Sequence, residues 1–197
     1  NSNYILLFFA ERYMEKIDVL DKDGNKTGIV KTKKEVYESG DYHRTVHIWI
    51  INDNNEILVQ KRHPKKETFP NLWAISVAGH VRSGETSLDA LKRELKEELG
   101  QKVEDKNIKF LFTLKREQPY KDHLLHVIDD VYLVKLNINV EETKLQFSEL
   151  TDIKYVYYEY LEQIFKNCDP EYVPYTQEHT KLFEFLHNMI DKESNNK

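Results

Sequence analysis

Five charged residues with fixed spacing lie in the segment 79–100, GHVRSGETSLDALKRELKEELG, and they could do chemistry together. They are Glu85, Arg93, Glu94, Glu97 and Glu98. Carboxylate oxygens are the ligands that hard divalent cations such as magnesium prefer. Such cations neutralise the charge that protects a phosphate chain from nucleophilic attack. The segment therefore indicates metal-assisted cleavage of a phosphoanhydride.

The same segment predicts the helix that would hold these carboxylates together. Thr86 is a suitable N-cap with Asp89 three residues later, and Gly100 is the expected end of the helix. At about 100° per residue, three carboxylates fall on one arc of this helix, namely Glu94, Glu97 and Glu98. A second arc is apolar and consists of Leu88, Leu91, Leu95 and Leu99. The carboxylates repel one another unless a cation or an arginine lies among them.

An ordinary solvated helix is the alternative to a catalytic one, because surface helices are rich in glutamate. The glycine loop that precedes the helix, Glu85 and the adjacent Arg93-Glu94 pair favour the catalytic interpretation. Arg93 lies one turn before Glu97 and is placed to pair with it.

The segment resembles the signature of the Nudix hydrolases, G-x5-E-x7-R-E-U-x-E-E-x-G-U, where U is a bulky apolar residue. Gln101 departs from this pattern at the last position, where an apolar residue is usual. The resemblance implies an α/β fold, an α/β/α sandwich around a mixed β-sheet, in which the signature forms a loop, a helix and a loop. An N-terminal β-hairpin and a C-terminal helix are expected to extend this fold.

The resemblance also implies a site for Mg2+ or Mn2+. Its ligands would be the backbone carbonyl near Gly79 and the carboxylates of Glu85, Glu94, Glu97 and Glu98, with Glu85 either stabilising the loop or contacting a further metal. Arg93 would orient the glutamates. A metal-polarised water would attack a nucleoside diphosphate linked to another group, and Glu94 or Glu97 would accept its proton.

The stretch from Glu15 to Gly100 also resembles the isopentenyl-diphosphate isomerase branch of the Nudix superfamily, through DVLDKDGNKTG, YHRTVHIWIIN, ILVQKR and FPNLWAISVAGH. Those isomerases use a cysteine just before the Gly-His pair, and Ala78 stands at that position. They also have three metal-binding histidines. Two of these match His43 and His80, and the third matches Val36, which cannot coordinate a metal. The chain is therefore predicted to be an isomerase-like hydrolase. The alternatives are an isomerase and a non-catalytic nucleotide-binding module.

Candidate substrate-binding residues lie outside the acidic helix, and they are His43, Arg62, His80, His126 and Asp130. Each has a plainer interpretation: the histidines as hydrogen-bonded scaffolding, Arg62 as part of a solvated basic loop, and Asp130 as an acidic strand edge. The segment 118–130 is expected to decide substrate specificity, and Asp129 or Asp130, at the start of an expected strand, is expected to complete the site.

The elements expected to position these residues alternate along the chain. Strands are expected over 17–20, 27–30, 43–51, 56–61, 72–77, 110–115, 128–135 and 152–157. Helices are expected over 32–39, 158–167 and 176–191, besides the acidic helix.

Composition limits the class of protein. The length of 197 residues suits a single domain, expected over 14–192, with an upstream or non-native extension over 1–13 and a disordered tail over 193–197. The net charge of −5 argues against bulk nucleic-acid binding. The single cysteine, Cys168, fits a reducing cytoplasm, and no stretch is long enough to span a membrane. The expected partner is a small nucleotide-like diphosphate, and a homodimer is compatible with the family.

Overall fold

The computed structural model describes residues 14–195, which form two compact units. The first unit contains residues 14–48 and 77–133, and the second contains residues 49–76 and 134–195. Strands β3 (His43–Ile51) and β8 (His123–Lys135) each contribute residues to both units. The expected extension over 1–13 lies outside the described residues, as do residues 196–197.

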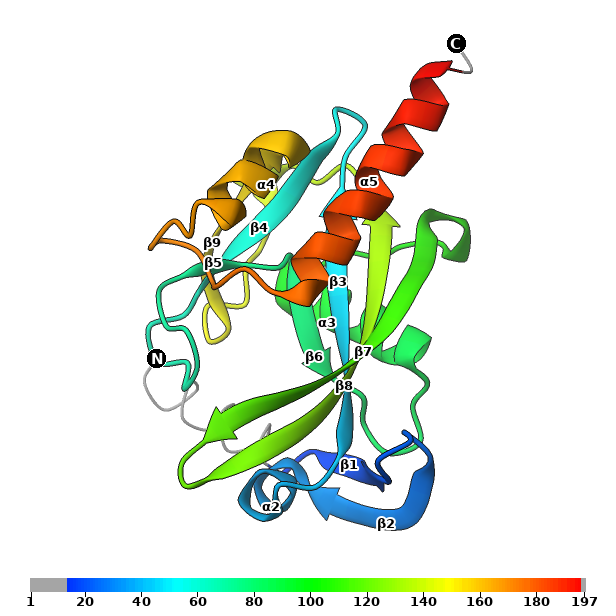
Figure 1. The fold of residues 1–197 in the computed structure, drawn as a ribbon, viewed down its shortest axis with the longest axis vertical. Coiled ribbons are helices and arrows are strands. Elements are labelled where there is room, and N and C mark those ends of the chain that lie inside the picture. Colours follow the sequence, from blue (N-terminus) through cyan, green and yellow to red (C-terminus); the bar gives the residue numbers. More distant parts are fainter. Residues whose placement is uncertain (1–13, 196–197) are drawn as a thin grey trace. The chain divides into compact units, whose positions relative to one another are not determined.

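The first unit begins with the expected hairpin and short helix (Figure 1). Strands β1 (Lys16–Leu20) and β2 (Lys26–Thr32) pair antiparallel. Their turn is closed by the Asp21 carboxylate, which accepts hydrogen bonds from the backbone N–H groups of residues 23 and 25. Helix α2 (Lys33–Ser39) follows, with a capping box at its start and left-handed Gly40 at its end. Local turn and cap residues therefore account for this whole segment.

The acidic helix is α3 (Ser87–Leu99), and both of its predicted caps are confirmed. Thr86 and Asp89 form a reciprocal capping box, and Gly100 closes the helix at φ 66°. The helix packs against β6 (Val77–His80), which pairs antiparallel with β3. Leu91, Leu95 and Leu99 are buried, as the apolar arc predicted.

The segment expected to decide substrate specificity, 118–130, is part of a long hairpin. Strands β7 (Ile108–Tyr120) and β8 extend through it, and the chain turns at Lys121, whose φ is 52°. Pro119 lies in β7, which ends the strand order, and an edge strand tolerates a proline because one side of it needs no donors. Both strands of the hairpin are longer than the strands expected over 110–115 and 128–135.

The second unit contains β4 (Glu56–Arg62), β5 (Trp73–Ala74), β9 (Leu150–Tyr157), α4 (Tyr158–Lys166) and α5 (Gln177–Asn195). Strand β4 pairs with both β5 and β9. The single strand expected over 72–77 is interrupted at Ser76, which is buried. Its hydroxyl accepts the N–H of Ile50 and donates to the carbonyl of Leu58, so a side chain replaces backbone pairing there.

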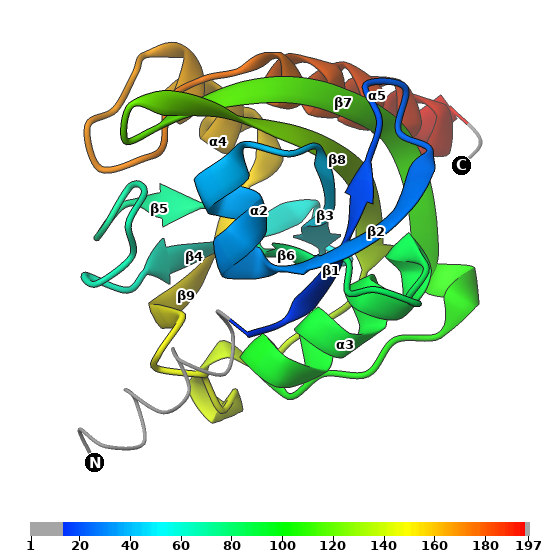
Figure 2. The same ribbon diagram turned by 90° about the horizontal axis from the view of Figure 1, so that it is seen from below.

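Strand pairing follows the order β5-β4-β3-β8-β7, with β6 paired to β3 and β9 paired to β4. The α+β fold, its N-terminal hairpin and its C-terminal helix are those expected. Helix α5 continues to Asn195, past the point where a disordered tail was expected to begin. Figure 2 shows α2 beside the β1–β2 hairpin in the first unit. Among residues 14–195, no helix is long and apolar enough to cross a membrane.

The end of α2 generates a prediction about stability. At Gly40, φ is +67° and an added Cβ would lie 2.7 Å from the carbonyl oxygen of Leu124. At Gly28, φ is +84° but no atom lies within 4 Å of an added Cβ. Gly28→Ala should cost about 1–2 kcal/mol from backbone strain alone, and Gly40→Ala should cost more. Urea denaturation of both variants measures the difference, and equal losses would contradict the close approach at Gly40.

Candidate active site

Glu94 is one of two buried carboxylates of the signature. It is 1% exposed and lies directly on the backbone of Gly79 in β6. A Cβ built on Gly79 would be 2.5 Å from Glu94 Cγ and closer still to the carboxylate. The signature glycine is therefore required because the glutamate occupies the space that any side chain would fill.

Arg93 joins the carboxylates of the signature to one another. Its Nε and Nη2 donate to the two oxygens of Glu85 at 2.7 and 2.9 Å, and its Nη1 lies 2.5 Å from Glu94 Oε1. A further bond of 2.8 Å runs from Nη2 to the carbonyl of His80. Burial acts to lower the pKa of Arg93, but the neighbouring carboxylates outweigh it and raise that pKa. The expectation that Arg93 orients the glutamates fits these contacts.

Glu97 is the most exposed of the three signature glutamates on α3. Its two oxygens lie 3.4 Å from Arg93 Nη1 and 3.4 Å from Arg82 Nη1. Its side chain is 29% exposed, whereas that of Glu94 is 1% exposed. Glu98 is also buried, on the same helix. Two of these three glutamates are therefore buried, and one is accessible.

The chemistry of this donor set fits a hard divalent cation, because it consists of carboxylate oxygens beside the backbone of Gly79. Among residues 14–195, no three His, Cys, Asp or Glu side chains converge closely enough to hold a metal ion. Instead, the carboxylates of Glu85, Glu94 and Glu97 contact Arg93.

A cluster of rings forms around α2 and the start of β3. The rings of His43 and His80 stack with 5.5 Å between centroids, and Tyr37 contacts both. The Tyr37 hydroxyl lies 3.0 Å from His80 Nε2, and His43 Nδ1 lies 3.1 Å from the carbonyl of Asp41. Burial lowers the pKa of His43 to about 4, so this imidazole is neutral at physiological pH. The two candidate histidines are thus brought together.

Asp129 and Asp130 face opposite sides of β8, as successive strand residues do. Asp129 is fully buried and accepts hydrogen bonds from Thr45 and Arg116. Burial acts to raise the pKa of Asp129, but His47 and Arg116 outweigh it and the pKa is lowered. Asp129 therefore lies beside His47 in the first unit.

Asp130, the aspartate proposed to bind substrate, is surrounded by scaffold contacts. It accepts hydrogen bonds from Arg44 Nη1 and Thr113 Oγ1, both at 2.7 Å, and from Ser87 at the start of α3. These contacts tie three strands to the helix. They favour the plainer, structural interpretation of Asp130.

His126 and Arg62 also make contacts that stabilise the scaffold. His126 Nδ1 lies 2.7 Å from the carbonyl of Gly40, and its ring packs on Tyr42. In the second unit, Arg62 donates to the carbonyl and the hydroxyl of Thr68 and so shapes the following loop. Their predicted role in substrate binding stays a prediction.

Sequence reasoning missed three residues that contact the site, namely Tyr37, Arg82 and Arg116. Arg82 stands in the signature loop at a position that the Nudix pattern leaves open. Tyr37 and Arg116 reach their partners only through tertiary structure. A basic residue inside the acidic signature was the one signal that could have found Arg82.

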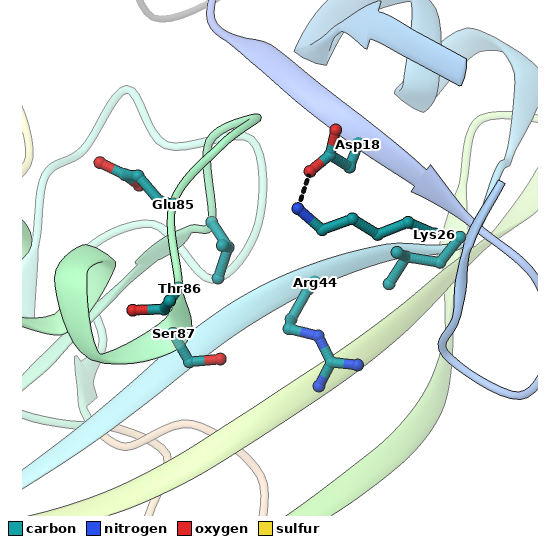
Figure 3. Close-up of a pocket in the computed structure, with 8 residues that line it drawn as sticks. Asp18, Lys26, Arg44, Glu85, Thr86 and Ser87 are labelled. Carbon is teal, nitrogen blue, oxygen red and sulfur yellow. Dashed lines mark ion pairs between the residues drawn. The ribbon is translucent and has the colours of Figure 1, made fainter. Parts of the chain in front are cut away.

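A cavity of about 270 Å3 lies beside the first turn of α3 (Figure 3). Its lining includes Asp18 and Lys26 of the hairpin, which form an ion pair of 2.6 Å, and Arg44 of β3. Glu85 is the one predicted metal ligand among its described lining residues. The cavity is thus next to the signature loop and separate from Glu94 and Glu97.

Comparison with known proteins identifies the family. The NUDIX domain family matches residues 41–178, which is more than half of the chain. The chain therefore belongs to the NUDIX family and is a Nudix-type hydrolase with a relationship to the isopentenyl-diphosphate isomerases.

Three similar proteins illustrate this assignment. Nudix hydrolase 3 of Arabidopsis thaliana is 40% identical over 87% of the chain, which spans 23% of that protein. Isopentenyl-diphosphate Delta-isomerase 1 of Photorhabdus laumondii is 33% identical over 55% of the chain and 61% of its own length. The crystal structure of DR0079 from Deinococcus radiodurans shares the fold, with a TM-score of 0.65 and 20% identity. The match covers 88% of this chain and 98% of the DR0079 chain.

The contact between Gly79 and Glu94 generates a double-mutant prediction. Gly79→Ala should destabilise the protein by about 1–3 kcal/mol, because the methyl group overlaps the Glu94 side chain. Glu94→Ala removes the three atoms nearest to that methyl group. In the double variant, the cost of the alanine at 79 should therefore largely disappear. Urea denaturation measures all four proteins, and additive losses would contradict the contact.

The buried state of His43 predicts how stability depends on pH. Its pKa falls from 6.5 to about 4 on folding, so the folded protein binds fewer protons between these values. This contribution to stability is complete above about pH 6.5 and is lost as the pH falls toward 4, amounting to about 2 kcal/mol between pH 7 and pH 5. His43→Asn should flatten this dependence in urea denaturation. His123→Asn should not flatten it. The pKa of His123 is raised on folding, so its contribution to stability changes with pH in the opposite direction. An unchanged slope in the His43 variant would contradict the prediction.

Proposed function

We propose that this chain cleaves a phosphoanhydride in a nucleoside diphosphate linked to another group, using a divalent cation held by the acidic helix. The observation that carries the proposal is the arrangement around Arg93, which gathers Glu85, Glu94 and Glu97 within reach of one guanidinium. Such a concentration of negative charge beside a glycine strand suits a cation that binds phosphate oxygens.

Nudix hydrolases use divalent metal ions, and we propose Mg2+ or Mn2+ here. When bound, the cation would draw negative charge from the phosphate oxygens and activate a water molecule. Glu94, Glu97, Glu98 and the carbonyl of Gly79 would hold it. Glu85 fixes Arg93 through hydrogen bonds. Burial acts to raise the pKa of Glu85, but the hydrogen bonds from Arg93 outweigh burial and lower that pKa. Glu85 therefore stays ionised and keeps Arg93 in place.

We assign proton removal to Glu97. Its side chain is 29% exposed, whereas Glu94 and Glu98 are each 1% exposed, so Glu97 is the signature glutamate of α3 that a water molecule can reach. Glu94 is pinned between Gly79 and Arg93, which suits a ligand better than a base.

The isomerase alternative requires a proton donor at the position of Ala78. Alanine cannot supply one. Cys168, the one cysteine of the sequence, is exposed and belongs to the second unit. The complete set of signature glutamates supports hydrolysis over a module that only binds nucleotides.

Glu97→Gln should reduce the turnover rate about 100-fold or more, because the amide side chain cannot accept the proton of water. Substrate binding should remain measurable. Product release from nucleoside triphosphates, nucleotide sugars, dinucleoside polyphosphates, dinucleotide cofactors and isopentenyl diphosphate, with Mg2+, with Mn2+ and with chelator, measures turnover. Glu104→Gln, which replaces an exposed glutamate paired with Lys106, is the control and should be silent.

Undiminished turnover in the Glu97 variant would contradict the assignment of the base. Conversion of isopentenyl diphosphate into its isomer, with no hydrolysis of any nucleotide, would instead establish the isomerase alternative.

A further inference from the structure

Arg82 presents a positive charge to the accessible edge of the acidic helix. Its Nη1 lies 3.4 Å from Glu97 Oε1, and its side chain is 33% exposed. A charge-assisted hydrogen bond normally measures about 2.7–2.9 Å, so this contact is long. Among the described residues, Glu97 is the one carboxylate that Nη1 contacts. This end of the guanidinium is therefore close to the proposed reaction and only weakly engaged.

The opposite edge of the same guanidinium is firmly held by Glu15. Arg82 Nε and Nη2 both donate to Glu15 Oε1, at 3.1 and 2.5 Å. The Glu15 side chain is only 9% exposed, so this ion pair is largely protected from water and salt. Because the guanidinium is planar and rigid, fixing one edge determines the direction of the other. Glu15 thus directs Nη1 toward Glu97.

The loop that carries Arg82 is attached to the same N-terminal strand. The N–H of Ser83 donates to the carbonyl of Lys16 at 2.7 Å, and the Ser83 hydroxyl donates to Asp18 at 2.7 Å. Residues 15–18 precede residue 41, where the match to the NUDIX family begins. A segment outside the matched region therefore fixes a charged side chain of the signature loop.

We propose that Arg82 binds a phosphate oxygen of the substrate through its Nη1 end, and that Glu15 is the positioning residue that orients it. This inference rests on the proposed function of the same site. A guanidinium keeps its charge at any physiological pH, and its donors match the oxygens of a phosphate. A diphosphate that approaches the carboxylates of α3 is repelled by them, and a cation beside Glu97 opposes that repulsion.

The kinetic test separates binding from chemistry. Loss of a hydrogen bond to a charged group weakens binding about 10- to 100-fold. Arg82→Gln should raise KM by that factor and change kcat little. Arg82→Lys keeps the positive charge but not the paired N–H donors of the guanidinium, so it should raise KM less. Glu15→Gln should raise KM as well, because Arg82 is no longer oriented. Lys92→Gln is the matched control: it removes one positive charge from α3 at an ion pair with Asp105, and it should leave KM unchanged.

A binding measurement tests the proposal without turnover. Calorimetric titration with inorganic pyrophosphate and Mg2+ should show about 10-fold or greater loss of affinity in the Arg82→Gln variant and none in the Lys92→Gln variant. Binding of Mn2+ alone, followed by electron paramagnetic resonance, should not weaken in either. The midpoint of urea denaturation shows whether each variant is folded.

Two results would overturn the role of Arg82. One is equal pyrophosphate affinity in the wild type and the Arg82→Gln variant, including the case in which neither binds. The other is a parallel loss of Mn2+ binding, which would mean that Arg82 acts on the metal ligands. The proposed function fails separately, when the wild type binds Mn2+ and pyrophosphate but hydrolyses no nucleotide.

Discussion

The contacts of Arg93 are the interaction on which the shape of the signature depends. A buried guanidinium is unfavourable unless its donors are satisfied by acceptors of opposite charge. Here Glu85 binds one edge, Glu94 binds Nη1, and the carbonyl of His80 takes a further N–H. These acceptors come from the loop, the helix and the end of β6. A single side chain therefore connects three segments, and replacing Glu85 or Glu94 would leave part of the guanidinium without its acceptor.

The glycine of β6 makes this arrangement sterically allowed. Because Gly79 has no side chain, the Glu94 carboxylate can lie against the strand and still reach Arg93. Glu15, just before the N-terminal hairpin, adds a further contact to the site. It holds Arg82, which contacts one oxygen of Glu97 while Arg93 contacts the other. The carboxylates of α3 thus differ in freedom: Glu94 is fixed between backbone and arginine, and Glu97 is accessible between two arginines.

Local interactions explain which features could be predicted from the sequence. The caps of α3, the turn at Asp21 and the left-handed glycine after α2 each depend on residues within four positions of one another, so the sequence alone carries their signal. The contact between Arg82 and Glu15 joins residues 67 positions apart. The β7–β8 hairpin was predicted only as strands over 110–115 and 128–135, and its full extent depends on the pairing of two strands at the edge of the strand order. Residue types identified the acidic site, and tertiary pairing decided which neighbours serve it.

The two faces of β6 bear on the choice between hydrolase and isomerase. Successive strand residues point to opposite sides. Gly79 meets Glu94 of α3, while Ala78 and His80 are register partners of His47 and Thr45 on β3. A cysteine at residue 78 would therefore project toward the histidines and away from the carboxylates. Proton transfer to carbon needs a donor on the histidine face, and a methyl group cannot serve. The proposed hydrolysis would draw on the carboxylate face, so an alanine at 78 removes the donor for isomerisation and leaves the residues proposed for hydrolysis in place.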